Sequence, residues 1–432
     1  MRFPLRCTAL VTAGLVLLPA LALLRLPRPR AEGLGRLLPH AALLQSFPAA
    51  PGRPVPQLWQ QRLPEVLVQQ LWGQQRQLWW QFWGQDGAGG AYLVLPLPRP
   101  IRVGSMGLPP HSLEVDGLLV VAANSLAETL LRDQLKRAPR QQRGLQQRCL
   151  DQLQRRQAAY WTADGLGAMA GPMAPLLQTF QEGCVELQLV SGSLQFEGEA
   201  AATSGLVAPA PAAGAAALPP PLSPDLLLQV SGQSLQPLLT GLLGRQLIRE
   251  PLVSAYGLQE SDLDLLQGSP FLLTLRPLPR GPFQAGLELV VAPRGDRQAW
   301  LRMLDGIAER LIDRGMDSDP AAASTWRDDA GRVVGGWRWS EQSDGPPLLQ
   351  LFLGPEPPIF RSPLADAAAW QALPALRLQA RPQALAAASL LPSQLPMPLQ
   401  QASSLELLAD RPGAADVGIS RLVGRLQLTP RP

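Results

Sequence analysis

The chain has 432 residues, 46% of them hydrophobic, so it is long enough for two or three domains and too apolar to be globally disordered. Its net charge of +4 is too small to indicate a nucleic-acid partner. With only two histidines, His40 and His111, the sequence argues against a serine-protease triad or a histidine-rich zinc site, and we expect no cofactor.

Residues 1–30 have the pattern of a signal peptide or a membrane anchor. Arg2 and Arg6 precede the uncharged stretch Cys7–Leu24, which as a helix would be about 27 Å long. This is close to the roughly 30 Å hydrocarbon core of a bilayer. If Ala20-Leu21-Ala22 is cleaved, the segment is a signal; otherwise it anchors the chain. Either way, we expect the remainder on the periplasmic or thylakoid-lumenal side of a membrane.

Residues 62–83 are predicted to form one helix, because Leu67, Leu71, Leu78 and Phe82 share a face and Gly84 follows. Three tryptophans lie on an adjacent stripe of this helix. They could belong to a buried core, to a helix lying in a membrane interface, or to an aromatic platform for a ligand. The three residues are Trp72, Trp79 and Trp83.

Extended runs follow this helix. The sequence predicts a strand over Ala91–Leu97 and a hairpin around Asp116-Gly117. A helix capped by Ser125 is predicted to reach Leu135, and a charged helix to cover 141–159.

The stretch 132–156 has the strongest charge bias, with eight basic residues and only Asp133 and Asp151 as acids. Such a stretch could contact anionic lipid headgroups or an acidic protein, or it could be a solvated helix face. The basic residues selected as a partner surface are Arg137, Arg140, Arg143 and Arg148.

Cys149 and Cys184 are the cysteines outside the N-terminal segment. A disulfide between them is conceivable in an oxidising compartment. Two cysteines in a chain of this length are not a disulfide framework, so two buried thiols are the favoured prediction.

A hairpin with one apolar face is predicted over 185–197, turning at Ser191-Gly192. The Ala/Pro/Gly tract 200–224 then indicates a flexible linker.

The pattern begins again after this linker. Leu222–Val230 resembles Leu38–Ser46, and Phe271–Pro279 resembles Ala91–Pro98. Later runs of the second half, including 345–354 and a final hairpin, also resemble runs of the first, and a helix capped by Asp296 is predicted over 297–314. A leucine-rich sequence can imitate itself in this way, and the alternative is a diverged duplication.

The predicted fold class is α+β, with two diverged repeat units of helices packed on mainly antiparallel sheet, behind an N-terminal apolar helix. The first unit would cover 36–199 and the second 225–428.

The apolar N-terminus, the Leu-Pro start of each half and the run Val115–Ala122 before the Ser125 helix give the chain a resemblance to a known family. It resembles a cyanobacteria-rich family of exported proteins classed as a domain of unknown function. The resemblance covers most of 36–428 and implies tandem α+β units behind a signal or anchor. It implies no catalytic residues.

These patterns predict a non-enzymatic, exported or membrane-anchored envelope protein that binds a protein or lipid partner. An envelope hydrolase that uses paired carboxylates is the alternative, because carboxylates are the plentiful catalytic side chains.

Overall fold

A computed structural model gives the fold. It describes residues 30–85, 90–97, 109–136, 141–170, 180–201, 221–236, 238–239, 246–278, 283–319, 322–341, 347–357, 370, 373–391, 399, 402–410 and 419–429. The predicted signal or anchor and most of the predicted linker lie outside these residues. Within them, no helix combines the length and the apolar character needed to cross a bilayer.

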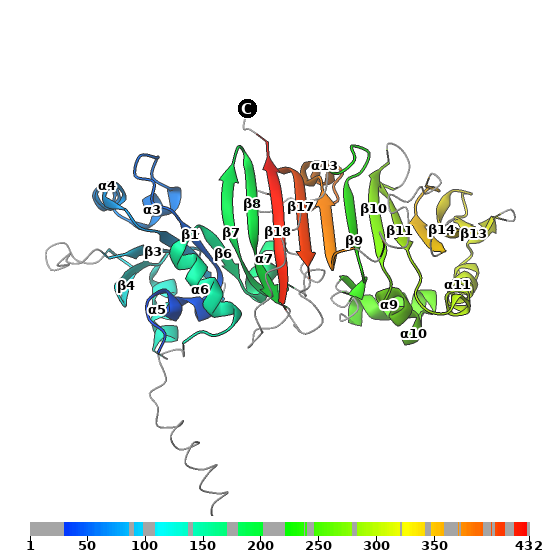
Figure 1. Cartoon of the computed structure of the whole chain (residues 1–432), viewed down its shortest axis with the longest axis horizontal. Coiled ribbons are helices and arrows are strands. Elements are labelled where there is room, and N and C mark those ends of the chain that lie inside the picture. Colours follow the sequence, from blue (N-terminus) through cyan, green and yellow to red (C-terminus); the bar gives the residue numbers. More distant parts are fainter. Residues whose placement is uncertain are drawn as a thin grey trace, which may run out of the picture.

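The described strands form one antiparallel sheet along the longest axis of the molecule (Figure 1). The first half pairs in the order β4 (Ser112–Val115), β5 (Leu118–Val121), β3 (Tyr92–Pro96), β2 (Trp79–Gly84), β1 (Ala41–Phe47), β6 (Ala158–Trp161), β7 (Glu182–Val190) and β8 (Ser193–Ala201).

The second half continues from β8 through β18 (Ile419–Leu428), β17 (Ala402–Asp410), β16 (Leu376–Ala380), β9 (Leu228–Gly232), β10 (Phe271–Pro277), β11 (Ala285–Val291), β15 (Leu348–Leu353), β14 (Val333–Ser340), β13 (Ala322–Arg327) and β12 (Asp317–Asp319).

The predicted fold class is therefore wrong. The chain does not form two α+β units with a sheet each, because β8 pairs with β18 from Ser193↔Gln427 to Ala201↔Ile419. This pairing joins the strands of the described residues into one sheet, which has 18 strands. The physical reason is that β8 and β18 would each otherwise be an edge strand with a row of unpaired backbone groups. The local sequence does not predict which two edge strands will pair.

The pairing order within the halves is nevertheless alike. From β9 to β18 the strands neighbour one another as those from β1 to β8 do, with β12 and β13 added at the far edge. The resemblance of Phe271–Pro279 to Ala91–Pro98 does not follow this order, since β10 lies beside β9 as β2 lies beside β1.

Helices pack on both faces of the sheet. On one face, α5 (Ser125–Leu135) and α6 (Leu145–Arg155) cover the core around Leu44 and Phe82, and both lie in front of the sheet in Figure 1. The other face packs against α3 (Gln57–Arg62), α4 (Glu65–Gln74), α7 (Ala163–Ala170), α11 (Arg297–Ile312) and α13 (Pro382–Ala387). Helices α9 (Gln246–Tyr256) and α10 (Glu260–Gln267) lie against α11.

Two predicted hairpins are confirmed, and their turns explain them. Asp116 and Gly117 have φ of 48° and 84° between β4 and β5, and Ser191 and Gly192 have φ of 50° and 78° between β7 and β8. Two consecutive residues with positive φ give the turn twist that suits a tight hairpin.

Predictions for the helices are mixed. Asp296 caps α11 by accepting a hydrogen bond from the backbone N–H of Gln298, as predicted. The cap of α5 is Asn124 rather than Ser125. The single helix over 62–83 is wrong: α4 ends at Gln74, and β2 begins at Trp79 because that run pairs with β1.

Candidate functional site

The tryptophans selected from the sequence form part of a core. Trp72 is 5% exposed and Trp79 is 4% exposed. The ring of Trp59 lies edge-on to both, with centroid distances of 5.0 and 5.7 Å. Trp83 is half-buried on β2. The interpretations of Trp72 and Trp79 as a membrane-interfacial stripe or an open ligand platform are therefore wrong. Trp79 is a residue of β2, which pairs with β1, and Trp72 of α4 packs in the same core cluster.

Two residues of the basic stretch pair with acids that lie far from it in the sequence. Arg148 lies 2.7 Å from Glu199, and Arg156 lies 2.7 Å from Glu186. Arg143 is exposed, while Arg137 and Arg140 lie outside the described residues. The expected excess of positive charge is thus reduced by carboxylates on β7 and β8.

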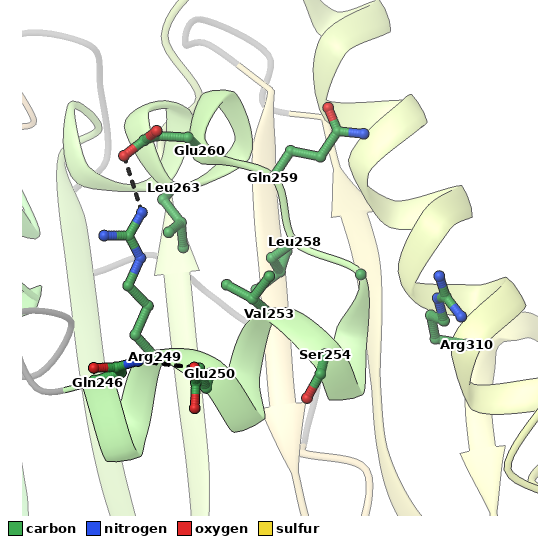
Figure 2. A pocket seen from close by; sticks show the side chains of 11 residues that line it. Gln246, Arg249, Glu250, Val253, Ser254, Leu258, Gln259, Glu260, Leu263 and Arg310 are labelled. Atoms are coloured by element: carbon green, nitrogen blue, oxygen red, sulfur yellow. Dashed lines mark hydrogen bonds and ion pairs between the residues drawn. The ribbon is translucent and has the colours of Figure 1, made fainter.

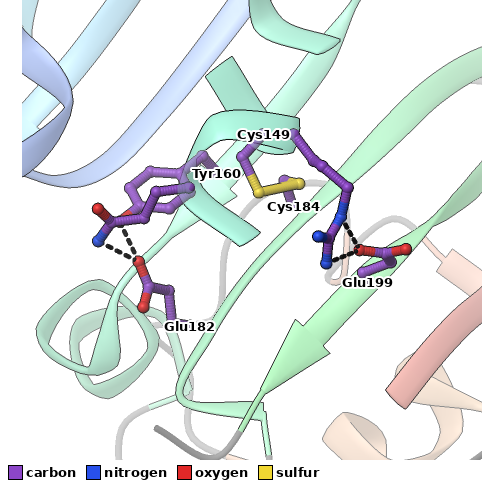
Figure 3. Close-up of a disulfide and its surroundings, with 7 residues drawn as sticks. Cys149, Tyr160, Glu182, Cys184 and Glu199 are labelled. Carbon is purple, nitrogen blue, oxygen red and sulfur yellow. Dashed lines mark hydrogen bonds and ion pairs between the residues drawn. A yellow bond between two sulfur atoms is a disulfide. The ribbon is translucent and has the colours of Figure 1, made fainter. Parts of the chain in front are cut away.

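Cys149 and Cys184 form a disulfide between α6 and β7, with their Cα atoms 5.5 Å apart (Figure 3). The prediction of two free thiols is wrong, because α6 packs on β7 where the two side chains face each other. Both residues are at most 1% exposed. Burial keeps a bulk thiol away from the sulfurs, so the bond acts as a structural link.

A buried polar cluster adjoins the disulfide. The Tyr160 hydroxyl and the Gln146 side-chain amide each donate a hydrogen bond of 2.7 Å to Oε1 of Glu182. Burial, followed by the nearby Glu182 carboxylate, raises the pKa of Tyr160. The phenol therefore keeps its proton and remains a donor, which suits a structural role.

A groove of about 1110 Å³ lies between α9 and α10 (Figure 2). Val253 and Leu263 contribute its apolar surface, and Arg249 reaches across it to Glu260 at 3.0 Å. Glu250 and Glu260 are both exposed. The general acid of a carboxylate pair usually lies in a buried, apolar pocket, whereas these two carboxylates are open to solvent. The groove gives no specific support to the hydrolase alternative.

Nine neighbouring strands carry an unbroken array of apolar residues on one face. In their order across the sheet they are β7, β8, β18, β17, β16, β9, β10, β11 and β15. Cross-strand pairing aligns the array in three rows. The rows are Leu189, Leu194, Leu426, Leu405, Ala380, Leu228, Leu275, Leu287 and Leu353; then Leu187, Phe196, Gly424, Leu407, Leu378, Val230, Leu273, Leu289 and Leu351; then Val185, Gly198, Leu422, Ala409, Leu376, Gly232, Phe271, Val291 and Leu349. We call these 27 positions the apolar face; they include no polar side chain.

The apolar face is incompletely covered. Leu189 and Leu353, at opposite ends of the first row, are 63% and 61% exposed. Leu187, Phe196 and Leu407 are half-buried, although Leu166 of α7 packs in the same cluster. Most other residues of the first two rows are half-buried, and the third row is buried. Apolar side chains that remain accessible beside one another are a feature of binding sites.

The opposite side of the same strands, here called the polar face, carries charged, amide and hydroxyl side chains together with apolar ones such as Leu272, Val290 and Leu408. The polar side chains include Glu186, Gln188, Gln195, Glu197, Glu199, Arg421, Arg425, Glu406, Arg377, Gln379, Gln229, Ser231, Thr274, Glu288 and Gln350. Many pair with one another: Arg425 lies 2.8 Å from Glu406, and Arg421 lies 2.5 Å from Glu197. Such pairing compensates part of the charge on the polar face.

The sequence analysis did not find the apolar face. Each strand shows the signal locally, as alternation of leucine with polar residues. The array arises only when nine strands from both halves adopt one register, and that is a tertiary property.

Among the described residues, no group of three or more histidine, cysteine, aspartate or glutamate side chains is placed to hold a metal ion. No protein-family model, no curated protein and no solved structure matches the chain.

Proposed function

We propose that this protein is a non-enzymatic binding protein of the cell envelope that holds its partner against the apolar face of the central sheet. The observation that carries the proposal is the apolar face itself, 27 aligned positions without a polar side chain. Burying the accessible part of this face against a partner would contribute about 25 cal/mol per Å² of apolar surface.

The disulfide supports an exported location. Disulfides persist in oxidising compartments such as the periplasm and are rare in the reducing cytosol. Together with the apolar N-terminal segment, the Cys149–Cys184 bond favours a periplasmic or thylakoid-lumenal site of action.

The test uses the fluorescent apolar probe 1-anilinonaphthalene-8-sulfonate with full-length protein secreted to an oxidising compartment. Leu189 and Val190 offer a matched pair, because they are adjacent and exposed and lie on opposite faces. We expect saturable probe binding that Leu187→Gln/Leu189→Gln weakens and Val190→Gln leaves unchanged. Equal weakening by both variants, or no saturable binding, contradicts the proposal.

A further inference from the structure

We infer that the Cys149–Cys184 bond is a redox latch: it exchanges with thiols in the folded protein when the contact between α6 and the β7–β8 hairpin opens locally. Oxidation holds α6 on the hairpin, and reduction leaves this contact free to open. The latch thereby ties fixation of the hairpin to an oxidising compartment. The inference concerns this bond alone and does not depend on what the apolar face binds.

Helix α6 lies across a narrow part of the sheet. Strand β6 has four residues, whereas β7 and β8 have nine each. It pairs with β7 only from Ala158↔Glu186 to Trp161↔Gly183. Because α6 packs on β1, β6 and β7, it bridges the short strand and fastens the hairpin to the first part of the sheet.

The apolar contacts of α6 are mainly with its own half of the sheet. Leu150 and Leu153 are buried in the same core cluster as Phe82 of β2. Among the described residues of the hairpin, only Cys184 and Ala201 belong to this cluster. Apolar packing therefore holds α6 on β1 and β2 more than on the hairpin.

The polar links from α6 to the hairpin lie partly in solvent. Arg148 pairs with Glu199 of β8, and these side chains are 30% and 23% exposed (Figure 3). Arg156, which follows the last turn of α6, pairs with Glu186 and is 64% exposed. Water competes for ion pairs of this kind, so each contributes little to stability. The covalent bond is the strong link across this contact.

One buried group favours opening. Oε1 of Glu182 accepts hydrogen bonds from Gln146 and Tyr160, but its Oε2 is buried and finds no hydrogen-bond partner in the described part of the chain. A buried acceptor without a partner destabilises the closed contact. Water reaches this oxygen when the contact opens, which lowers the free energy needed for local opening.

The exchange needs a thiol from outside the chain, and glutathione serves as the probe. Its thiolate attacks one sulfur, which forms a mixed disulfide and releases the other cysteine as a thiolate. A second glutathione thiolate attacks the mixed disulfide, so the products are two protein thiols and glutathione disulfide. Because Cys149 and Cys184 are at most 1% exposed, the first attack requires the opening.

The experiment measures how fast glutathione reduces the full-length secreted protein at several urea concentrations below its unfolding transition. Samples are alkylated, and mass spectrometry quantifies the peptides that contain Cys149 and Cys184. The urea dependence of an opening reaction increases with the surface that it exposes. We expect a rate nearly independent of urea, because the strand pairs stay closed. A rate that rises as steeply with urea as global unfolding overturns the inference.

A matched pair of variants locates the opening. Arg148→Met removes the ion pair between α6 and β8 and should accelerate reduction about threefold. Arg132→Met removes an ion pair with Glu128 inside α5 and should leave the rate unchanged. Equal acceleration by both variants, or no acceleration by Arg148→Met, overturns the inference, because the opening is then not at the α6–hairpin contact.

Discussion

The two faces of the nine central strands are built from alternate residues of the same segments, yet they differ in both chemistry and burial. On the polar face, Glu288 is 4% exposed and accepts hydrogen bonds from Gln350 and Thr274. On the apolar face, Leu353 of the same strand as Gln350 is 61% exposed. Buried groups of the polar face such as Glu288 and Gln350 find partners on neighbouring strands, whereas Leu353 on the apolar face remains accessible to solvent.

The largest expected effect comes from breaking the disulfide that links α6 to β7. The Cys149–Cys184 disulfide links residues 35 apart in sequence, and its loss should lower the free energy of unfolding by about 4 kcal/mol in the chain-entropy model. Urea unfolding of the secreted protein with and without reductant measures this, with Cys149→Ala/Cys184→Ala as the matched variant. Identical midpoints would show that the bond does not constrain the unfolded chain.

The same polar substitution should lower the free energy of unfolding more on the apolar face than at the neighbouring position on the polar face. Leu422 is 5% exposed on the apolar face, and Val423 is half-buried on the polar face. Leu422→Gln should cost about 3 kcal/mol, because it removes packed methyl groups and buries an amide. Val423→Gln should cost less than about 1 kcal/mol. Equal shifts in the urea midpoint would mean that the two faces are not distinct.

The buried carboxylate on the polar face depends on its partner. Arg425→Met leaves Glu406 without its charge partner and should cost about 2 kcal/mol, less than for a fully buried pair, because Arg425 is 35% exposed. The double variant Arg425→Met/Glu406→Leu should recover most of this stability. A double-mutant cycle from thermal unfolding measures the coupling, and additive losses would show that the pair is not coupled.

The smallest effect concerns Tyr160. Tyr160→Phe removes one hydrogen bond to Glu182 and should cost about 1 kcal/mol at neutral pH. Because the folded-state pKa of Tyr160 is raised, its contribution is fully present below the ordinary tyrosine pKa of about 10 and is lost as pH rises above that value.

The melting temperature measured between pH 8 and pH 11 follows this loss. The melting temperature should fall less steeply with pH in Tyr160→Phe than in the parent protein. A slope unchanged by Tyr160→Phe would place the alkaline sensitivity elsewhere.

The sequence by itself determined the features that depend on neighbouring residues, namely turns, a helix cap and the alternation within a strand. The turns at Asp116-Gly117 and Ser191-Gly192 follow from residues that tolerate positive φ, and α11 follows from the Asp296 cap and its apolar stripe. Alternation within 185–198 established that this hairpin has one apolar side.

Tertiary structure decided what these elements form together. Pairing with β1 made Trp79 a strand residue and buried it, although the spacing of Leu67, Leu71 and Leu78 favoured a helix. Pairing of β8 with β18 joined the halves and aligned nine apolar strand segments into one face. Alternation specifies which side of a strand is apolar, but it carries no information on which distant strand supplies the neighbour.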